Sequence, residues 1–246
     1  MSAGQSALAF RRTQARDLLL TALAPAIWGS SYIVTTQLLP QVPAMTVALL
    51  RALPAGLLLL AFARRLPQGV WWLRVFILGA LNFSVFWSML FVSAYRLPGG
   101  AAATVGAVQP LVVVFLAAWV LGSALRPASV LGALAGLAGV ALLVLTPGVS
   151  LDATGIAAGL AAAVSMACGT VLTRKWRAPV PLLTFTAWQL TAGGLLLLPV
   201  ALWAGPDFPA PTPGHLIGLA WLGLVGAALT YVLWFRGIAR LEPNMV

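Results

Sequence analysis

Long apolar runs alternate with short separators along the whole chain. Eight of these runs reach the roughly 20 residues that a helix needs to cross the core of a bilayer. They cover approximately residues 18–39, 44–63, 72–95, 100–121, 128–146, 153–173, 181–203 and 215–238. The separators contain charges or Gly/Pro breakers, such as Arg64-Arg65 and the proline-rich stretch 205–214. Backbone polar groups in lipid must be satisfied within the segment, and the runs lack the alternation of barrel strands. The pattern therefore predicts an all-α membrane protein with eight spanning helices.

Composition supports a membrane protein. Of the 246 residues, 61% are hydrophobic and 7% are charged, whereas an average soluble domain is roughly 45–50% apolar and about 25% charged. This excludes soluble and disordered classes, and the single Cys168 excludes a disulfide scaffold. The formal net charge is +10, but the basic residues form short clusters rather than one face. We therefore expect the lipid bilayer and a small-molecule substrate as partners, and no nucleic acid.

Arginine and lysine in short loops predict the orientation. With a cytoplasmic N-terminus only Arg96 falls outside, and Arg51 lies within the second run. The residues that fall inside are Arg11, Arg12, Arg16, Arg64, Arg65, Arg74, Arg126, Arg174, Lys175, Arg177, Arg236 and Arg240. The first run is too long for a cleaved signal. We expect a multi-pass protein of the cell (plasma or inner) membrane with its N-terminus in the cytoplasm.

The chain contains an internal repeat. An offset of 138 residues aligns 26–60 with 164–198, with coincident pairs Thr35/Thr173, Val42/Val180, Pro43/Pro181, Thr46/Thr184 and Gly56/Gly194. After a longer linker, an offset of 144 adds Leu78/Leu222, Gly79/Gly223, Phe91/Phe235 and Arg96/Arg240. The first copy holds five helices, and an odd number places the second copy upside-down relative to the first. Inverted repeats of this kind build secondary transporters with a site near the midplane.

The repeat predicts two domains. Residues 1–148 form the first copy, with helices 1–5, and residues 149–246 form an incomplete second copy, with helices 6–8. By comparison with the first copy, we expect the natural protein to continue for roughly another 50 residues. A genuine eight-helix protein is the alternative.

Several segments resemble the drug/metabolite transporter superfamily, and more narrowly its EamA-domain group with pigment-exporter-like members. They are Ala26–Tyr32, Arg51, Gly106–Val112 and Leu131–Leu143. The resemblance covers the whole chain and implies ten helices in two inverted five-helix repeats, with export as the direction of transport. One departure is Gly122-Ser123, where many relatives have Gly-Glu at the end of the fourth helix.

Polar and aromatic residues inside the spans are candidates for a binding site. Trp28, Ser31 and Tyr32 share one helix face, and Gln109-Pro110 interrupts the fourth run, since proline removes a backbone donor. Interrupted helices near the midplane are typical of transporter sites. Helix packing is the alternative role for such residues. The substrate-binding candidates are Trp28, Ser31, Tyr32, Asn82, Phe86, Gln109 and Tyr231.

Arg51 is the only basic residue well inside a predicted span. A central arginine costs about 2.5–3.5 kcal/mol on insertion scales. Three roles stay open: snorkelling to the interface, a structural bond to a neighbouring helix, or contact with an anionic substrate. The 138-residue offset pairs Arg51 with Gln189, for which we expect a role in helix packing.

No constellation for catalysis, metal binding or a cofactor is visible. His215 is the only histidine and lies at a helix boundary, and Cys168 has no partner. The four acidic residues Asp17, Asp152, Asp207 and Glu242 lie at predicted helix ends or in loops. Because no carboxylate lies in a span, we expect exchange or downhill flux, or coupling through further helices.

We therefore expect a secondary transporter that moves a small amphipathic metabolite by alternating access. A channel or lipid-flipping protein, a metabolite importer and a membrane-embedded enzyme are the alternatives, the last being disfavoured. Small residues at Gly132/Gly136 and Gly155/Gly159 favour close packing within the chain. A homodimer contact through them is the alternative.

Overall fold

In the computed structural model the described residues 3–125, 127–144, 152–204 and 210–241 form helices and connecting loops. The α-helices are α1 (Ala3–Leu38), α2 (Ala44–Ala63), α3 (Trp71–Gly79), α4 (Val85–Arg96), α5 (Gly99–Gly106), α6 (Gln109–Leu121), α7 (Pro127–Val144), α8 (Ala153–Trp176), α9 (Leu182–Ala204), α10 (Pro213–Ala220) and α11 (Thr230–Arg240). Two π-helical segments, η1 (Ala80–Ser84) and η2 (Trp221–Leu229), join α3 to α4 and α10 to α11. The prediction of an all-α membrane protein is confirmed.

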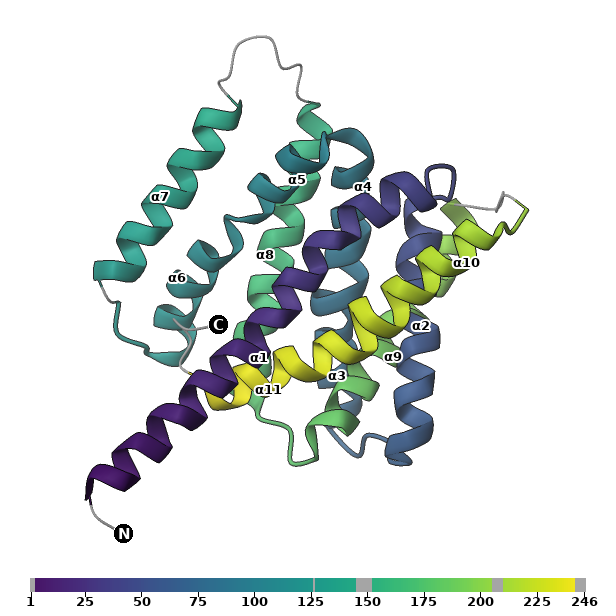
Figure 1. The fold of residues 1–246 in the computed structure, drawn as a ribbon. Coiled ribbons are helices and arrows are strands. Elements are labelled where there is room, and N and C mark those ends of the chain that lie inside the picture. Colours follow the sequence, from purple (N-terminus) through teal and green to yellow (C-terminus); the bar gives the residue numbers. More distant parts are fainter. Residues whose placement is uncertain (1–2, 126, 145–151, 205–209, 242–246) are drawn as a thin grey trace.

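Seven described helices are long and apolar enough to cross a membrane. They are Gln14–Leu38, Ala44–Ala63, Trp71–Arg96, Gly100–Leu121, Ala153–Trp176, Leu182–Trp203 and Pro213–Arg240. Each corresponds to one of the predicted runs. The fifth predicted run corresponds to α7, in which Val130–Gly139 is a shorter apolar stretch. In Figure 1, α7 lies at one side of the bundle beyond α6, and it contacts α5 and α6.

The closest helix pair in the bundle is α2 with α9. A Cβ atom on Gly56 would lie 2.5 Å from the backbone nitrogen of Thr191, and one on Gly194 would lie 2.7 Å from the Cα of Leu53. Both obstacles are backbone atoms that cannot move aside. The absence of a side chain at these two positions, which the 138-residue offset pairs, is what lets the helices touch.

One helix boundary differs from the sequence prediction, and one predicted interruption is present. Helix α1 begins at Ala3, before the apolar run starts, so Asp17 lies within a helix and is only 5% exposed. The prediction that Asp17 lies at a helix end is therefore wrong, because the helix extends well before it. The fourth run is divided by a turn at Ala107 and Val108. Pro110 lies in the first turn of α6, where a missing backbone N–H costs little.

The π-helical segments occupy corresponding positions in the two predicted copies. Adding the 144-residue offset to 80–84 gives 224–228, which lies inside η2. A π-helix bonds residue i to residue i+5, so each turn holds an extra residue and the faces after it are rotated. A single 3.6-residue period therefore does not predict which side chains share a helix face along the third and eighth runs.

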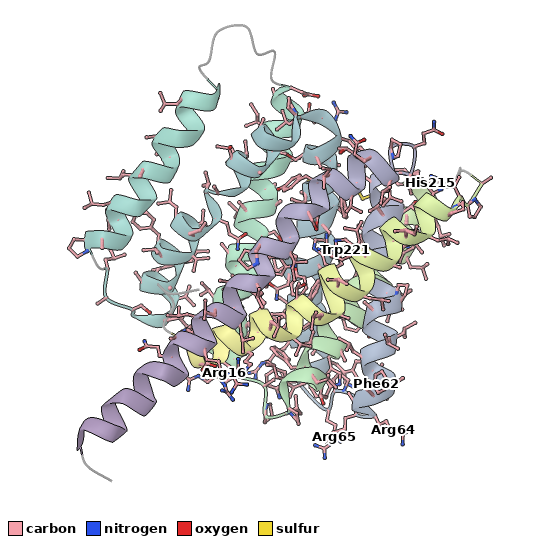
Figure 2. The ribbon with its side chains drawn as sticks, in the orientation of Figure 1. Arg16, Phe62, Arg64, Arg65, His215 and Trp221 are labelled. Carbon is pink, nitrogen blue, oxygen red and sulfur yellow. The ribbon has the colours of Figure 1, made fainter. Side chains whose placement is uncertain are left out.

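Three of the arginines that the sequence analysis assigns to the cytoplasmic side lie toward the same end of the bundle. Figure 2 places Arg16, Arg64 and Arg65 toward its lower end and His215 at its upper end. His215 belongs to a helix cap: its backbone N–H donates to Thr212 Oγ1 at 3.2 Å, and its Nδ1 accepts from the Thr212 N–H at 3.4 Å. This histidine thus organises the start of α10.

The glycines at the start of α8 pack within the chain. A Cβ atom on Gly159 would lie 2.7 Å from Val105 Cγ1, and one on Gly155 would lie 2.8 Å from Leu97 Cγ. These glycines let α8 approach α5 and the end of α4, which is the role favoured for them by the sequence.

Candidate functional site

A cavity of about 620 Å³ lies among α1, α2, α4, α5, α6, α8 and α11. Its size falls within the ~300–1,000 Å³ typical of small-molecule sites. Aromatic rings, small residues and a few polar groups form its wall. The aromatic side chains are Trp28, Tyr32, Phe86, Trp87, Tyr231 and Trp234. Among the described residues that line it, none is acidic and Arg51 is the only basic one.

The structure brings most of the predicted site residues to this one cavity. Those that line it are Trp28, Ser31, Tyr32, Phe86, Gln109 and Tyr231, together with Arg51. They come from α1, α2, α4, α6 and α11, which are far apart in the sequence. Binding of a substrate by these side chains stays a prediction.

Asn82 is placed differently from the prediction. It is 0% exposed and is not among the residues lining the cavity. Its Nδ2 donates to Gln189 Oε1 at 2.7 Å and to Thr173 Oγ1 at 3.3 Å. The physical reason is η1, because the π-helical turn separates Asn82 from the face that carries Phe86. We therefore assign Asn82 to the contact between η1 and α9 rather than to the cavity.

Arg51 is held at the cavity wall by uncharged groups. The residue is 1% exposed, which excludes snorkelling to the interface. Its Nη2 donates to the Gly226 carbonyl at 2.7 Å, its Nη1 donates to Ser31 Oγ at 3.2 Å, and its guanidinium carbon lies 4.5 Å from the centre of the Trp87 ring. The Gly226 carbonyl also accepts from Trp28 Nε1 at 3.0 Å. Arg51 thus joins α2 to α1, α4 and η2.

Tyr231 is the centre of an aromatic cluster beside Arg51. Its ring centroid lies 4.5 Å from that of Phe83, 4.8 Å from that of Trp28 and 5.7 Å from that of Trp87. Such tilted and edge-on arrangements are favourable for aromatic rings and fix their planes. The cluster therefore holds the aromatic side of the cavity in a fixed arrangement.

Sequence reasoning missed part of the lining. Trp87, Ser93 and Thr170 also face the cavity. Ser93 lies seven residues after Phe86, and this helical spacing could have indicated it. Thr170 is the residue that the 138-residue offset pairs with Tyr32, so the repeat could have indicated it. Trp87 had no such signal, because it lies directly beside Phe86 in the sequence.

Ion pairs connect helices at two separate places. Arg96 Nη1, at the end of α4, lies 2.7 Å from Asp152 Oδ2, and Asp152 also caps α8 by accepting from the Thr154 N–H at 2.7 Å. The hydrogen bond from Arg96 holds the pKa of Asp152 below its usual value. Arg236 Nη2, in α11, lies 2.5 Å from Asp17 Oδ1 in α1.

A bundle of apolar spanning helices around a cavity is the architecture expected of a membrane transporter. A solved crystal structure has the same fold, with a TM-score of 0.74 and 25% identity over 94% of this chain and 81% of the other. PecM of Dickeya dadantii is 44% identical over 222 residues, which is 89% of this chain and 74% of PecM. The inner membrane transporter YedA of Escherichia coli is 28% identical over 89% of this chain and 73% of its own.

The model of the EamA-like transporter family matches residues 16–145 and 153–246. This chain belongs to that family. The resemblance to the drug/metabolite transporter superfamily is thereby confirmed, and the protein is a multi-pass membrane transporter.

Proposed function

We propose that this protein is a secondary transporter that moves a small amphipathic metabolite out of the cell by alternating access. The observation that carries the proposal is the central cavity, which combines a wall of aromatic rings with a few hydrogen-bonding groups. A ligand with a flat apolar part and a polar part matches such a wall. We place the protein in the cell membrane with its N-terminus in the cytoplasm.

Alternating access requires two halves that move against each other around the site. We propose that residues 1–148 and 149–246 are those halves. Helices α1 and α8, which are the first helices of the two halves, both line the cavity, and the paired residues Tyr32 and Thr170 both face it. The corresponding positions of η1 and η2 also support a repeat.

The ion pairs at these two places are suited to hold opposite ends of the cavity closed. Each joins the third spanning helix of one half to the first spanning helix of the other: α4 to α8 through Arg96 and Asp152, and α11 to α1 through Arg236 and Asp17. In inverted halves these helix ends belong to opposite membrane faces. We propose that one pair separates when the cavity opens to its side while the other persists.

The names of relatives support export and an inner membrane location. A protein of Streptantibioticus cattleyicolor, 27% identical over 73% of this chain and 59% of its own, is named a probable terminal-alkyne amino-acid exporter. YedA is named an inner membrane transporter. Those descriptions belong to the relatives, and for this chain they favour the proposed direction and membrane.

Counterflow in liposomes tests the proposal. The full-length protein is reconstituted and a panel of amino acids, aromatic metabolites and organic ions is assayed with and without a proton gradient. We expect saturable counterflow that is lost in Tyr32→Ala and Gln109→Ala and retained in Phe115→Ala, an exposed position on the same helix as Gln109. Flux without saturation or counterflow would instead identify a channel.

Orientation has its own test. A cysteine placed beside Arg64 should stay unreactive toward an impermeant thiol reagent added outside intact cells. Labelling from outside would contradict the cytoplasmic assignment of the N-terminus.

A further inference from the structure

We propose that Arg51 is the anion-binding group of the cavity and that the substrate is a small aromatic organic anion, such as an aryl carboxylate. This inference rests on the proposed transport function and names its substrate class. It is carried by three observations: the uncompensated charge of Arg51, a matched neutral contact elsewhere in the bundle, and the excess of hydrogen-bond donors in the cavity wall.

The charge of Arg51 has no counter-charge in the cavity. The groups that hold it are a backbone carbonyl, a hydroxyl and an indole ring, all of them neutral. No acidic residue lines the cavity, and Arg51 Nε, although buried, has no acceptor within the described part of the chain. A buried charge is costly unless it is paired. A bound anion would supply the missing partner.

A second contact in the bundle shows that this packing does not require a charge. The 138-residue offset pairs Arg51 with Gln189 and Ser31 with Gly169, and the 144-residue offset pairs Gly226 with Asn82. We call the group of Arg51, Ser31 and Gly226 the first contact. Its counterparts Gln189, Gly169 and Asn82 also lie together and form the second contact. There, however, the partners are amides: Asn82 Nδ2 donates to Gln189 Oε1 at 2.7 Å.

The two contacts differ in which residue is a glycine and therefore has no side chain. In the second contact Asn82 fills the space and Gly169 makes room for it, since a Cβ on Gly169 would lie 2.6 Å from Asn82 Cγ. In the first contact Gly226 has no side chain, and a Cβ there would lie 3.3 Å from Arg51 Nη2. The neutral contact of Asn82 and Gln189 is fully buried and does not line the cavity, whereas Arg51 lines the cavity. This asymmetry favours a ligand-binding role for the charge of Arg51.

The rest of the wall also favours a ligand that accepts hydrogen bonds. Among the described residues, several buried atoms of the lining have no hydrogen-bond partner, including Arg51 Nε, Trp234 Nε1, Ser93 Oγ and Thr170 Oγ1. The first two can only donate. A carboxylate accepts several hydrogen bonds and matches the planar guanidinium. The rings of Trp28, Tyr32 and Phe86, which line the cavity and are only partly buried, favour a ligand with an aromatic body, and a cavity of about 620 Å³ is large for an inorganic ion.

Matched pairs of probes test the proposal. Benzoate, 1-naphthoate and indole-3-acetate are each compared with the corresponding uncharged amide at pH 7, as competitors of radiolabelled 1-naphthoate binding to the purified full-length protein in nanodiscs. We expect at least one carboxylate to bind tenfold or more tightly than its amide, which corresponds to about 1.4 kcal/mol. If every carboxylate binds no better than its amide, or none binds, the proposal is wrong.

Variants test whether Arg51 causes the preference for the carboxylate over the amide. Arg51→Gln, which copies the counterpart Gln189, should lower the preference for the carboxylate to within about twofold, and Arg51→Lys should retain part of it. Arg74→Gln is the control, because Arg74 stacks on Trp71 and Trp176 and does not line the cavity. An Arg51→Gln protein that keeps the full preference would overturn the assignment. If Arg51→Gln does not fold, the preference of the unmodified protein and of Arg51→Lys decides.

Counterflow separates this inference from the function on which it rests. Saturable counterflow of uncharged aromatic solutes, with no preference for their carboxylates, would leave the transporter proposal standing and refute the anion site. Absence of saturable counterflow with every member of the broader panel would refute the transporter proposal itself.

Discussion

Gly169→Ala should be one of the most destabilising single-methyl changes in this protein. The added Cβ would overlap the amide of Asn82, with its Cγ only 2.6 Å away. That amide is not free to swing aside, because it is fully buried and donates to Gln189 at 2.7 Å and to Thr173 at 3.3 Å. Either α8 moves away from η1 or the hydrogen bonds break.

The cost follows from these two outcomes. Overpacking of a filled interior costs about 1–3 kcal/mol. Displacing Asn82 instead leaves the buried oxygen of Gln189 without its donor, which costs about 1–3 kcal/mol. Whichever outcome occurs, we therefore expect Gly169→Ala to lower the free energy of unfolding by about 1–3 kcal/mol. Asn82→Ala, which only removes the hydrogen bonds, should cost about 1–3 kcal/mol.

A double-mutant cycle isolates the overlap. Equilibrium unfolding of the purified protein in mixed micelles is followed by tryptophan fluorescence for both single variants and for Gly169→Ala/Asn82→Ala. The double variant has no amide to overlap, so it should be about as stable as Asn82→Ala alone, which gives a coupling energy of about 1–3 kcal/mol. Gly132→Ala in α7 is the control, since no described atom lies within 4 Å of its added Cβ.

Additive costs would refute this reasoning. If the double variant loses the sum of the two single losses, the alanine at 169 acts somewhere other than at Asn82. A Gly169→Ala protein as stable as Gly132→Ala would show that α8 and η1 are not as close as described.

Three further predictions follow from particular contacts. Gly56→Ala should abolish folding or cost more than about 3 kcal/mol, because its Cβ would lie 2.5 Å from a backbone nitrogen of α9; normal yield and stability would contradict this. Trp28→Phe keeps an aromatic ring but removes the indole N–H, which donates a bifurcated hydrogen bond to the Gly226 carbonyl at 3.0 Å and to Thr230 Oγ1 at 2.8 Å, so the free energy of unfolding should fall by about 1–2 kcal/mol in the same assay. Asp17→Asn should weaken the pair with Arg236 and raise labelling of a cavity cysteine from the cytoplasmic side, and unchanged labelling would refute the proposed closing role.

The spanning helices were predictable because the bilayer fixes their length. The seven observed spans differ from the corresponding predicted runs by a few residues at most, and the interruption near Gln109 was visible from Pro110. The start of α1 was not predictable from the apolar pattern. The apolar run begins only after the charged residues near the N-terminus, whereas the helix already begins at Ala3. Asp17 was therefore assigned to a helix end, although it is buried in a pair with Arg236.

Side-chain positions were predictable only where the helix is regular. Trp28, Ser31 and Tyr32 reach the cavity together because α1 keeps one period across them. Asn82 does not face the cavity together with Phe86, because the wider π-helical turn of η1 lies between them. The role of Arg51 stayed open for a different reason. Its strongest partner is the carbonyl of Gly226, a backbone atom 175 residues away that no side-chain pattern reveals.

The paired π-helical segments carry information about ancestry. A π-helical turn accommodates one residue more than the regular helix around it, so it records an insertion into a helix that was already formed. Because η1 and η2 lie at corresponding positions, descent of the two halves from a single segment would place that insertion before the duplication. The same widened turn would then belong to the third helix of the ancestral segment from which both halves descend.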